Sequence, residues 1–370
     1  MLPNKDFKFL SLLSWICSFV VVLYHYVWFF EIDNFKSNSI INYLVVRQEY
    51  GANFVWLYWA ISGFIFTYIV LNKKKILFKN FFLEIFRRFY PLQILTLLYI
   101  CLIQFVSFNL NGTTQLDYKN NFYHFFLHLF FASDWGFHEN FSFNAPVWFM
   151  SILIPIYLFA FLTKNYLIKL KSIFGILVIS LTFFFIPLFY DIFFSKLDLF
   201  NKWQYLALFN FKQCFFYFYF GSIIYFILNS IWSSNILKID NLISTVSFVT
   251  ICCSIYFLNF NENKIFEYFP NTILLFLGLI VFFSNLDYIT NFSFYRIHII
   301  NKTSFSIYLW HFPFQLSLLT FLDYFNKDII IFRSIYIFLL YILILIIISS
   351  LSYYYYEKPF RKKIKSYIKY

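Results

Sequence analysis

Ten separate runs of mostly apolar residues, each about long enough to cross a membrane, occupy most of the sequence. A helix needs about 20 such residues to cross the hydrocarbon core, because each residue advances the chain by about 1.5 Å. The candidate spans are residues 9–30, 53–71, 89–107, 145–163, 173–193, 213–231, 241–260, 270–285, 303–323 and 329–354. The run 270–285 is short and the run 173–193 contains Pro187, so these two are the weakest. The pattern predicts an all-α polytopic membrane protein with about ten transmembrane helices.

The composition fits a chain whose surface faces lipid. Hydrophobic residues make up 61% of the 370 residues and charged residues 12%, whereas a soluble protein has roughly 45–50% and about 25%. A soluble core cannot bury so much apolar surface. A soluble multidomain protein, a disordered chain, a secreted disulfide scaffold and a nucleic-acid-binding domain are therefore excluded. All the cysteines fall in apolar runs, so we expect them to be buried and unpaired: Cys17, Cys101, Cys214, Cys252 and Cys253.

Basic residues are concentrated in loops that fall on one predicted side of the membrane. Lysine and arginine outnumber the acidic residues by 29 to 17. The basic segments are 72–80, 164–172 and the tail after residue 354, whereas the opposite loops are acidic or mixed. Cytoplasmic loops carry the excess of Lys and Arg in membrane proteins. Both termini are therefore predicted to be cytoplasmic, which requires an even number of spans. The lipid bilayer explains the positive charge, and no nucleic-acid partner is expected.

A shorter apolar stretch, residues 122–133, is predicted to be an interfacial or re-entrant helix. It contains His124 and His128, which are spaced to share one face of a helix. Two histidines at this spacing can hold zinc. The sequence supplies no accompanying HExxH glutamate and no evident third ligand, so no metal site is expected.

Two histidines lie inside candidate spans, where an ionisable side chain costs a few kcal/mol and suggests a functional role. His25 lies about 16 residues into the first span, roughly 24 Å along the helix and in its outer third. His311 lies about 8 residues into the ninth span. It is therefore expected nearer mid-depth, because each residue advances the helix by about 1.5 Å. A neutral imidazole can act as a general base near neutral pH. The alternative for each is a histidine bonded to a backbone carbonyl or lying at the interface.

Arg87 and Arg88 stand where the third span is predicted to begin. One interpretation is a cytoplasmic anchor that reaches the lipid headgroups. The other is an anion-binding site at the inner mouth, because a guanidinium group pairs bidentately with phosphate. Glu84 is spaced to pair with Arg88 one helical turn away.

Three further residues mark positions within or at the ends of spans. Ser62 precedes Gly63 in the second span, a small-residue step that usually indicates close helix packing. Trp148 and Ser151 mark the outward start of the fourth span, where tryptophan is common at the interface.

Seven segments, taken in order, resemble the acyltransferase-3 family of integral membrane acyltransferases, which includes O-acetylases of lipopolysaccharide, capsule and other exported glycans. The segments are VVLYHY with His25, NFVWLYWAISGFIFTYIV, FRRFYPLQIL with Arg88 and Pro91, NAPVWFMSILIPIYLF, FYFYFGSIIYFI with Gly221, SFSIYLWHFPF with His311, and YYYYEKPFRKK. Each segment is a weak signal alone, but the ordered set covers nearly the whole chain.

The sequence departs from the family pattern at three positions. Ser14 stands where the family usually has an arginine, eleven residues before the histidine of the first span. Ile85 replaces the other arginine of the basic motif, and Leu153 replaces a glutamate after the Trp-Ser-Leu segment. Ser14 and Leu153 favour the alternative of a non-catalytic relative that transports or binds acyl groups or lipid-linked sugars. Retention of His25, Arg88, His311 and Glu357 favours an enzyme.

The resemblance implies transfer of an acyl group, with acetyl-CoA as the expected donor substrate, to a hydroxyl of an exported glycan or glycolipid. His25 would be the catalytic base, His311 a second polar group in the path, and Arg87 and Arg88 the residues that hold the donor's phosphates. The substrate path would include Ser62, Trp148 and Ser151.

No permanently bound cofactor is expected. We expect one domain over residues 1–370 in a bacterial inner membrane, without the extracytoplasmic hydrolase-like domain fused to some family members.

Overall fold

The structure is a computed structural model that describes residues 7–32, 51, 53–72, 76–115, 119–138, 140–169, 202–232, 237–260, 265–289 and 297–366. These residues are almost entirely helical, and no strand occurs among them. The predicted span 173–193 lies outside the described residues.

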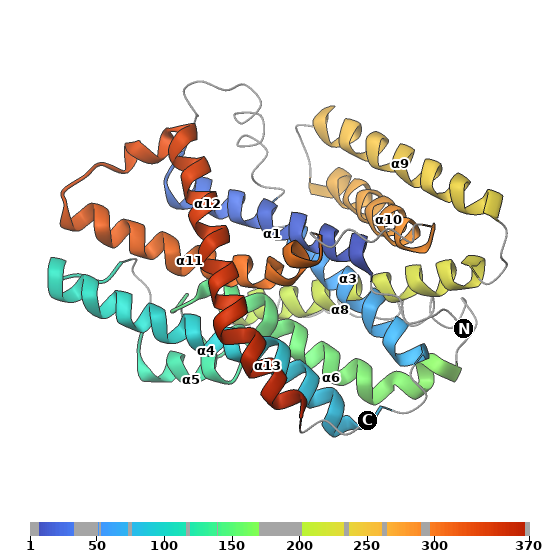
Figure 1. The fold of residues 1–370 in the computed structure, drawn as a ribbon, viewed down its shortest axis with the longest axis horizontal. Coiled ribbons are helices and arrows are strands. Elements are labelled where there is room, and N and C mark those ends of the chain that lie inside the picture. The colour runs from blue at the N-terminus through green and yellow to red at the C-terminus, as the bar shows by residue number, and fades with distance from the viewer. Residues whose placement is uncertain are drawn as a thin grey trace.

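Figure 1 shows the described helices in chain order by colour. The elements are α1 (Lys8–Phe29), α3 (Asn53–Asn72), α4 (Phe78–Asn111), α5 (Phe122–Leu129), η2 (Ala145–Val147), α6 (Trp148–Lys169), α8 (Lys202–Trp232), α9 (Leu237–Phe260), α10 (Ile265–Ile289), α11 (Ile297–Tyr324), η4 (Ile329–Arg333), α12 (Ile335–Ser352), η5 (Tyr353–Glu357) and α13 (Lys358–Lys365). In the described ranges, eight helices are long and apolar enough to cross a membrane, and α9 holds a shorter apolar helix, Asp240–Tyr256. The prediction of an all-α polytopic membrane protein is confirmed.

Polar contacts bring alternate helix ends together at one end of the bundle. The start of α1 meets the end of α10, where the backbone amides of Phe9 and Leu10 donate to the Asp287 carboxylate at 2.9 and 3.0 Å. The end of α10 meets the end of α8, and the end of α8 meets the end of α3 through the Asn72 side chain. The first half of α4 meets α13, because Arg361 donates to the Arg88 carbonyl. The first described helix therefore begins, and the last ends, at the same end of the bundle.

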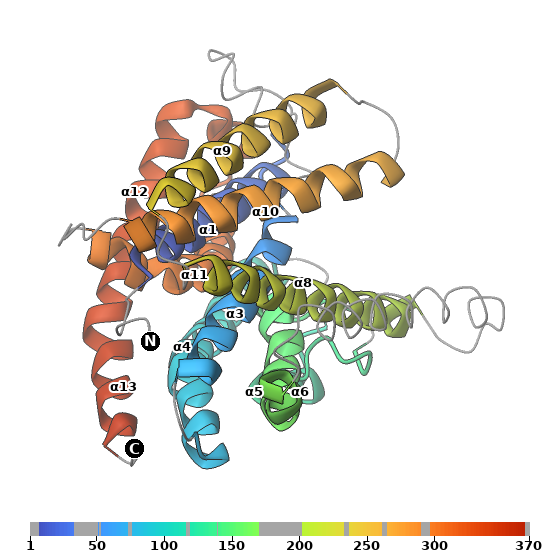
Figure 2. The ribbon, with the colours of Figure 1, turned by 90° about the vertical axis from the view of Figure 1, so that its right-hand side faces the viewer.

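Two glycines allow α3 and α8 to cross in close contact (Figure 2). A Cβ atom on Gly63 would lie 1.7 Å from the Phe218 carbonyl oxygen, and one on Gly221 would lie 1.8 Å from the Ala60 carbonyl oxygen. Each glycine therefore faces the backbone of the other helix. This is the close packing that the Ser62-Gly63 step indicates.

Several helices extend beyond the apolar runs that identified them. The α4 helix begins at Phe78 and α11 at Ile297, well before the predicted spans. Hydropathy locates the apolar part of a helix, but lysine and arginine are good helix formers and do not end it. Arg87 and Arg88 consequently lie inside α4, not where it begins.

The expectation that all cysteines are buried is wrong for Cys252 and Cys253, which are exposed. Both lie on α9, which packs beside α10 at the edge of the bundle (Figure 1). The other side of α9 is available to lipid, so an apolar side chain there needs no protein partner. Cys17 and Cys214 are buried as expected, Cys101 is half-buried, and all five cysteines are free.

Candidate active site

The two intramembrane histidines face each other across the contact between α1 and α11. Their ring centroids lie 5.0 Å apart with an interplanar angle of 32°. His311 is fully buried, and its Nδ1 contacts the Tyr308 carbonyl oxygen. Donation from Nδ1 leaves the lone pair on Nε2. Neither His311 Nε2 nor His25 Nδ1 has a hydrogen-bond partner within the described part of the chain, although both atoms are buried.

The prediction that the two histidines lie at different depths is wrong. It placed His311 nearer mid-depth because the apolar run begins near residue 303. The helix itself begins at Ile297, so His311 lies further along α11 and level with His25. Two basic nitrogens thus share one buried site.

A hydrogen-bonded group of three hydroxyls, from α1, α3 and α11, lies about two helical turns before this pair along α1 and α11. Ser304 Oγ is 2.8 Å from Ser18 Oγ and 2.6 Å from Tyr58 Oη. The Tyr58 ring lies 6.2 Å from that of Tyr308, which in turn lies 5.7 Å from His311. Polar and aromatic groups therefore extend from the histidine pair toward the first half of α11.

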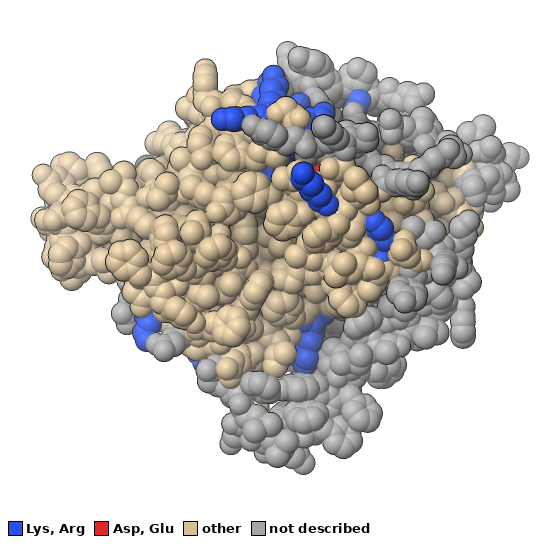
Figure 3. Space-filling model, turned by 90° about the horizontal axis from the view of Figure 1, so that it is seen from below, with Lys and Arg blue, Asp and Glu red and all other residues tan. Residues whose placement is uncertain are grey.

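A cavity of about 860 Å³ opens at the end of the bundle where α4 begins. Its walls come from α3, α4, α6, η5 and α13. Its basic lining residues are Arg87, Arg88, Lys358, Arg361, Lys362 and Lys365, with Glu84 as the acidic lining residue. Figure 3 shows the described Lys and Arg side chains in a few separate groups among mostly uncharged described residues. The excess of basic side chains makes the electrostatic potential in this cavity favourable for an anion.

Glu84 contacts the Arg87 guanidinium, and not Arg88 as the one-turn spacing suggested. Arg88 is exposed, and its guanidinium lies 5.2 Å from the Phe89 ring centroid. Because Glu84 contacts Arg87, the Arg88 guanidinium is the one on α4 that can face a ligand.

The three predicted substrate-path residues take packing positions. Ser62 is buried beside the crossing of α3 and α8. Trp148 packs edge-on against Trp59 at a centroid distance of 5.7 Å. Ser151 Oγ accepts a hydrogen bond from the Asp134 amide at 3.0 Å. Their role in a substrate path stays a prediction.

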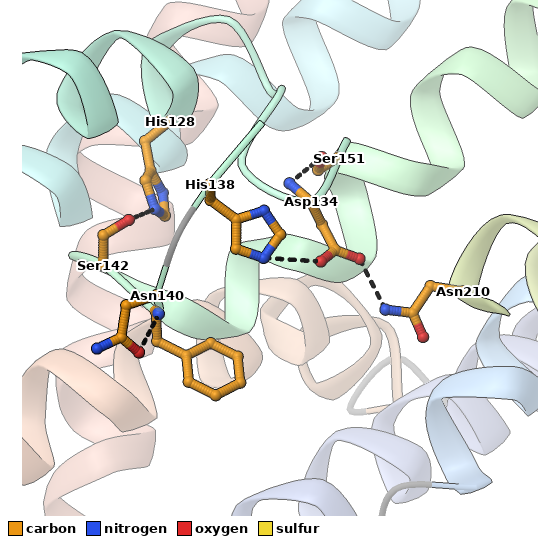
Figure 4. Close-up of polar contacts among 8 residues, drawn as sticks. His128, Asp134, His138, Asn140, Ser142, Ser151 and Asn210 are labelled. Atoms are coloured by element: carbon orange, nitrogen blue, oxygen red, sulfur yellow. Dashed lines mark hydrogen bonds and ion pairs between the residues drawn. The ribbon is translucent and has the colours of Figure 1, made fainter. Parts of the chain in front are cut away.

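A polar cluster in the loop after α5 is absent from the sequence predictions (Figure 4). Asn210 of α8 donates to Asp134 Oδ2 at 2.7 Å, and His138 Nε2 lies 3.6 Å from Asp134 Oδ1. All three side chains are buried. Burial raises the pKa of the Asp134 carboxyl to about 7, although the bond from Asn210 opposes the shift. Burial, with a contribution from His124, lowers the pKa of His138 to about 4.

The two histidines of α5 are each hydrogen-bonded. His124 Nδ1 lies 2.7 Å from the Asn121 side-chain oxygen, and His128 Nε2 lies 3.1 Å from Ser142 Oγ (Figure 4). The described residues contain no group of three potential metal ligands. The opposite face of α5 exposes the aromatic side chains Phe122, Tyr123 and Phe126. This face suits the predicted interfacial helix.

The three departures from the family pattern occupy ordered positions. The Ser14 carbonyl accepts a hydrogen bond from Ser304 Oγ at 3.1 Å, which places Ser14 beside the group of three hydroxyls described above. Ile85 lines the basic cavity. Leu153 is buried in the apolar core.

Sequence reasoning overlooked Tyr58, Asp134 and Arg361. The spacing of Asp134 and His138, four residues apart, was a usable signal. Glu357, which pairs with Arg361, belongs to the closing Glu-x-Pro-Phe segment. Nothing in the pattern distinguished Tyr58 from the many other tyrosines.

Comparison with known proteins identifies the family. Neither curated proteins nor solved structures yield a match to this chain. The family model described as an acyltransferase domain matches residues 7–354, nearly the whole chain. The matched region contains both histidines, the α4 arginines and the three departures. The chain therefore belongs to the acyltransferase-3 family of membrane proteins.

Proposed function

We propose that this protein is a membrane O-acyltransferase that moves an acyl group from a cytoplasmic acyl-CoA to a hydroxyl of an exported glycan. The observation that carries the proposal is the His25–His311 pair, in a chain of an acyltransferase family. An acetyl group from acetyl-CoA is the proposed donor group. The membrane is a bacterial inner membrane, with the basic end of the bundle in the cytoplasm.

The donor binds with its phosphates in the basic cavity. A guanidinium group pairs bidentately with phosphate, and Arg88 has an exposed guanidinium on the wall of the cavity. Arg87 adds charge beside it, partly neutralised by Glu84. The acyl thioester arm then extends along the hydroxyls of Ser18, Tyr58 and Ser304 toward the histidines.

His25 acts as the general base in the transfer step. It takes the proton from the acceptor hydroxyl as the hydroxyl oxygen attacks the thioester carbonyl carbon. The new carbon–oxygen ester bond forms, the carbon–sulfur bond breaks, and the proton passes to the departing CoA thiolate. His311 supplies the second basic nitrogen at the site. The contact of its Nδ1 with the Tyr308 carbonyl holds the imidazole ring in one orientation.

The alternative is a non-catalytic relative that carries or binds acyl groups or lipid-linked sugars. Ser14, Ile85 and Leu153 favour it, since each replaces a charged residue that the family usually has at that position. Retention of both histidines favours the enzyme. A carrier does not need two buried imidazole nitrogens that have no hydrogen-bond partner among the described residues.

Mass analysis of the surface glycan tests the proposal. Cells that express the wild type should carry a glycan heavier by one acyl group than cells without the gene. The increment should disappear with His25→Ala and fall with Arg88→Ala, at unchanged protein level. A wild type that adds no mass to its native glycan contradicts the enzyme proposal and favours the carrier.

A further inference from the structure

The basic cavity has a second charged wall. Six basic residues and one acidic residue line it, and four of the basic residues come from α13, after the end of the apolar run. In the sequence these charges served only to place the tail in the cytoplasm. In the structure, α13 packs against the first half of α4 (Figure 1), and both helices contribute basic side chains to the lining of the cavity.

Arg361 fixes α13 to α4. Its Nη2 donates to the Arg88 carbonyl oxygen at 3.2 Å and to Glu357 Oε2 at 2.7 Å. The Arg361 side chain is 23% exposed, whereas Glu357 is fully buried. A buried carboxylate paired with a partly exposed guanidinium holds the cation in one place at the cavity wall.

Glu357 also connects this wall to the helix that carries His311. Its Oε1 accepts a hydrogen bond from Ser306 Oγ on α11 at 2.5 Å. Ser306 is five residues before His311 in the same helix. Glu357 ends the π-helical turn Tyr353–Glu357, a widened turn that often marks functional sites.

We infer that α13 forms the second half of the donor-phosphate site, with Lys362 and Lys365 as ligand-binding cations and Glu357 as the residue that positions Arg361. The inference rests on the proposed function, because it names further residues for the same donor. CoA carries a diphosphate and a phosphomonoester, and two basic walls can hold more of this charge than Arg87 and Arg88 alone.

The test measures binding of CoA to the purified full-length protein in phosphatidylcholine nanodiscs by calorimetry. CoA with a free thiol is not a donor, so no turnover occurs. The double variant Lys362→Gln/Lys365→Gln should raise the Kd at least about fivefold, because each lost cation weakens a charge-assisted contact. Lys363→Gln is the matched control, since Lys363 lies on the same helix but does not line the cavity. Its Kd should stay within about twofold of the wild-type value.

Glu357→Gln tests the positioning role. Arg361 should lose its fixed place, so the KM for the acyl donor should rise about tenfold while kcat changes less. Glu357→Asp keeps the charge and should recover part of the affinity. A fall in kcat with an unchanged donor KM would contradict the role, as would no recovery with Asp.

Two outcomes overturn the inference on α13. In one, the Lys362/Lys365 variant binds CoA like the wild type, or Lys363→Gln weakens binding as much. In the other, phosphatidylglycerol in the nanodisc abolishes CoA binding, which makes the cavity a lipid-headgroup site. A wild type that binds CoA but transfers no acyl group contradicts the proposed function alone. Normal transfer with unchanged CoA binding by the α13 variants contradicts only this inference.

Discussion

The imidazole rings of His25, on α1, and His311, on α11, lie 5.0 Å apart. The same helix contact joins Ser18 to Ser304, which are 286 positions apart in the sequence. The two helices run side by side in the same direction, because Ser18 meets Ser304 as His25 meets His311. The basic cavity opens at the end where α4 begins. Under the proposed function, the cavity holds the anionic donor and the histidine pair transfers the proton.

Arg88→Ala should raise the KM for the acyl donor about tenfold with little change in kcat, because it removes a charged contact made to the bound donor in ground and transition states alike. Arg87→Ala should have a smaller effect, since Glu84 already pairs with Arg87. Steady-state kinetics with varied acyl-CoA measures both. A fall in kcat at an unchanged KM would show that Arg88 does not hold the donor.

Gly63→Ala should destabilise the protein by about 1–3 kcal/mol through overpacking. Alanine is the better helix former by roughly 1 kcal/mol. The added Cβ would nevertheless lie 1.7 Å from the Phe218 carbonyl oxygen, so α3 and α8 must separate. Thermal unfolding in detergent measures the change. Leu339→Ala, on an exposed position of α12, is the control and should shift the midpoint much less. An unchanged midpoint for Gly63→Ala would disprove the close crossing.

The pair Asp134 and His138 should give opposite pH dependences of stability. The folded-state pKa of Asp134 is about 7 against an ordinary value of 3.8, so its contribution to stability falls as pH rises from about 4 to 7. The folded-state pKa of His138 is about 4 against 6.5, so its contribution rises with pH between about 4 and 6.5. In the wild type the two slopes oppose each other.

Single variants separate the two slopes. Asp134→Asn should become more stable as pH rises from 4 to 6.5, and His138→Gln should become less stable between 4 and 7. Unfolding midpoints measured across this range test both signs. Parallel pH profiles for the two variants would contradict the assignment.

The sequence predicted the fold class and singled out both histidines as candidates, because apolar runs and ionisable residues within them are local signals. It did not predict that the histidines meet. The apolar run that located the ninth span begins after Ile297, the true start of α11, so His311 was assigned the wrong depth.

The second wall of the cavity was hidden for a different reason. The tail cations had a sufficient explanation in membrane topology, and their position depends on the π-helical turn before Lys358 and on the Glu357–Ser306 bond. Neither the π-helical turn nor the Glu357–Ser306 hydrogen bond leaves a periodic signal in the sequence. The Asp134–Asn210 contact likewise joins a loop to a helix far along the chain.

The most direct test of the account follows acyl transfer by purified protein in nanodiscs, with acetyl-CoA and the native surface glycan of the host. Mass spectrometry measures the acylated product formed by the wild type, His25→Gln and His128→Gln. His128 is the control, because it is a buried histidine bonded to Ser142 and remote in sequence from both members of the pair. The account predicts a loss of at least about 100-fold for His25→Gln and near-normal transfer for His128→Gln. Transfer at the wild-type rate by His25→Gln would contradict it.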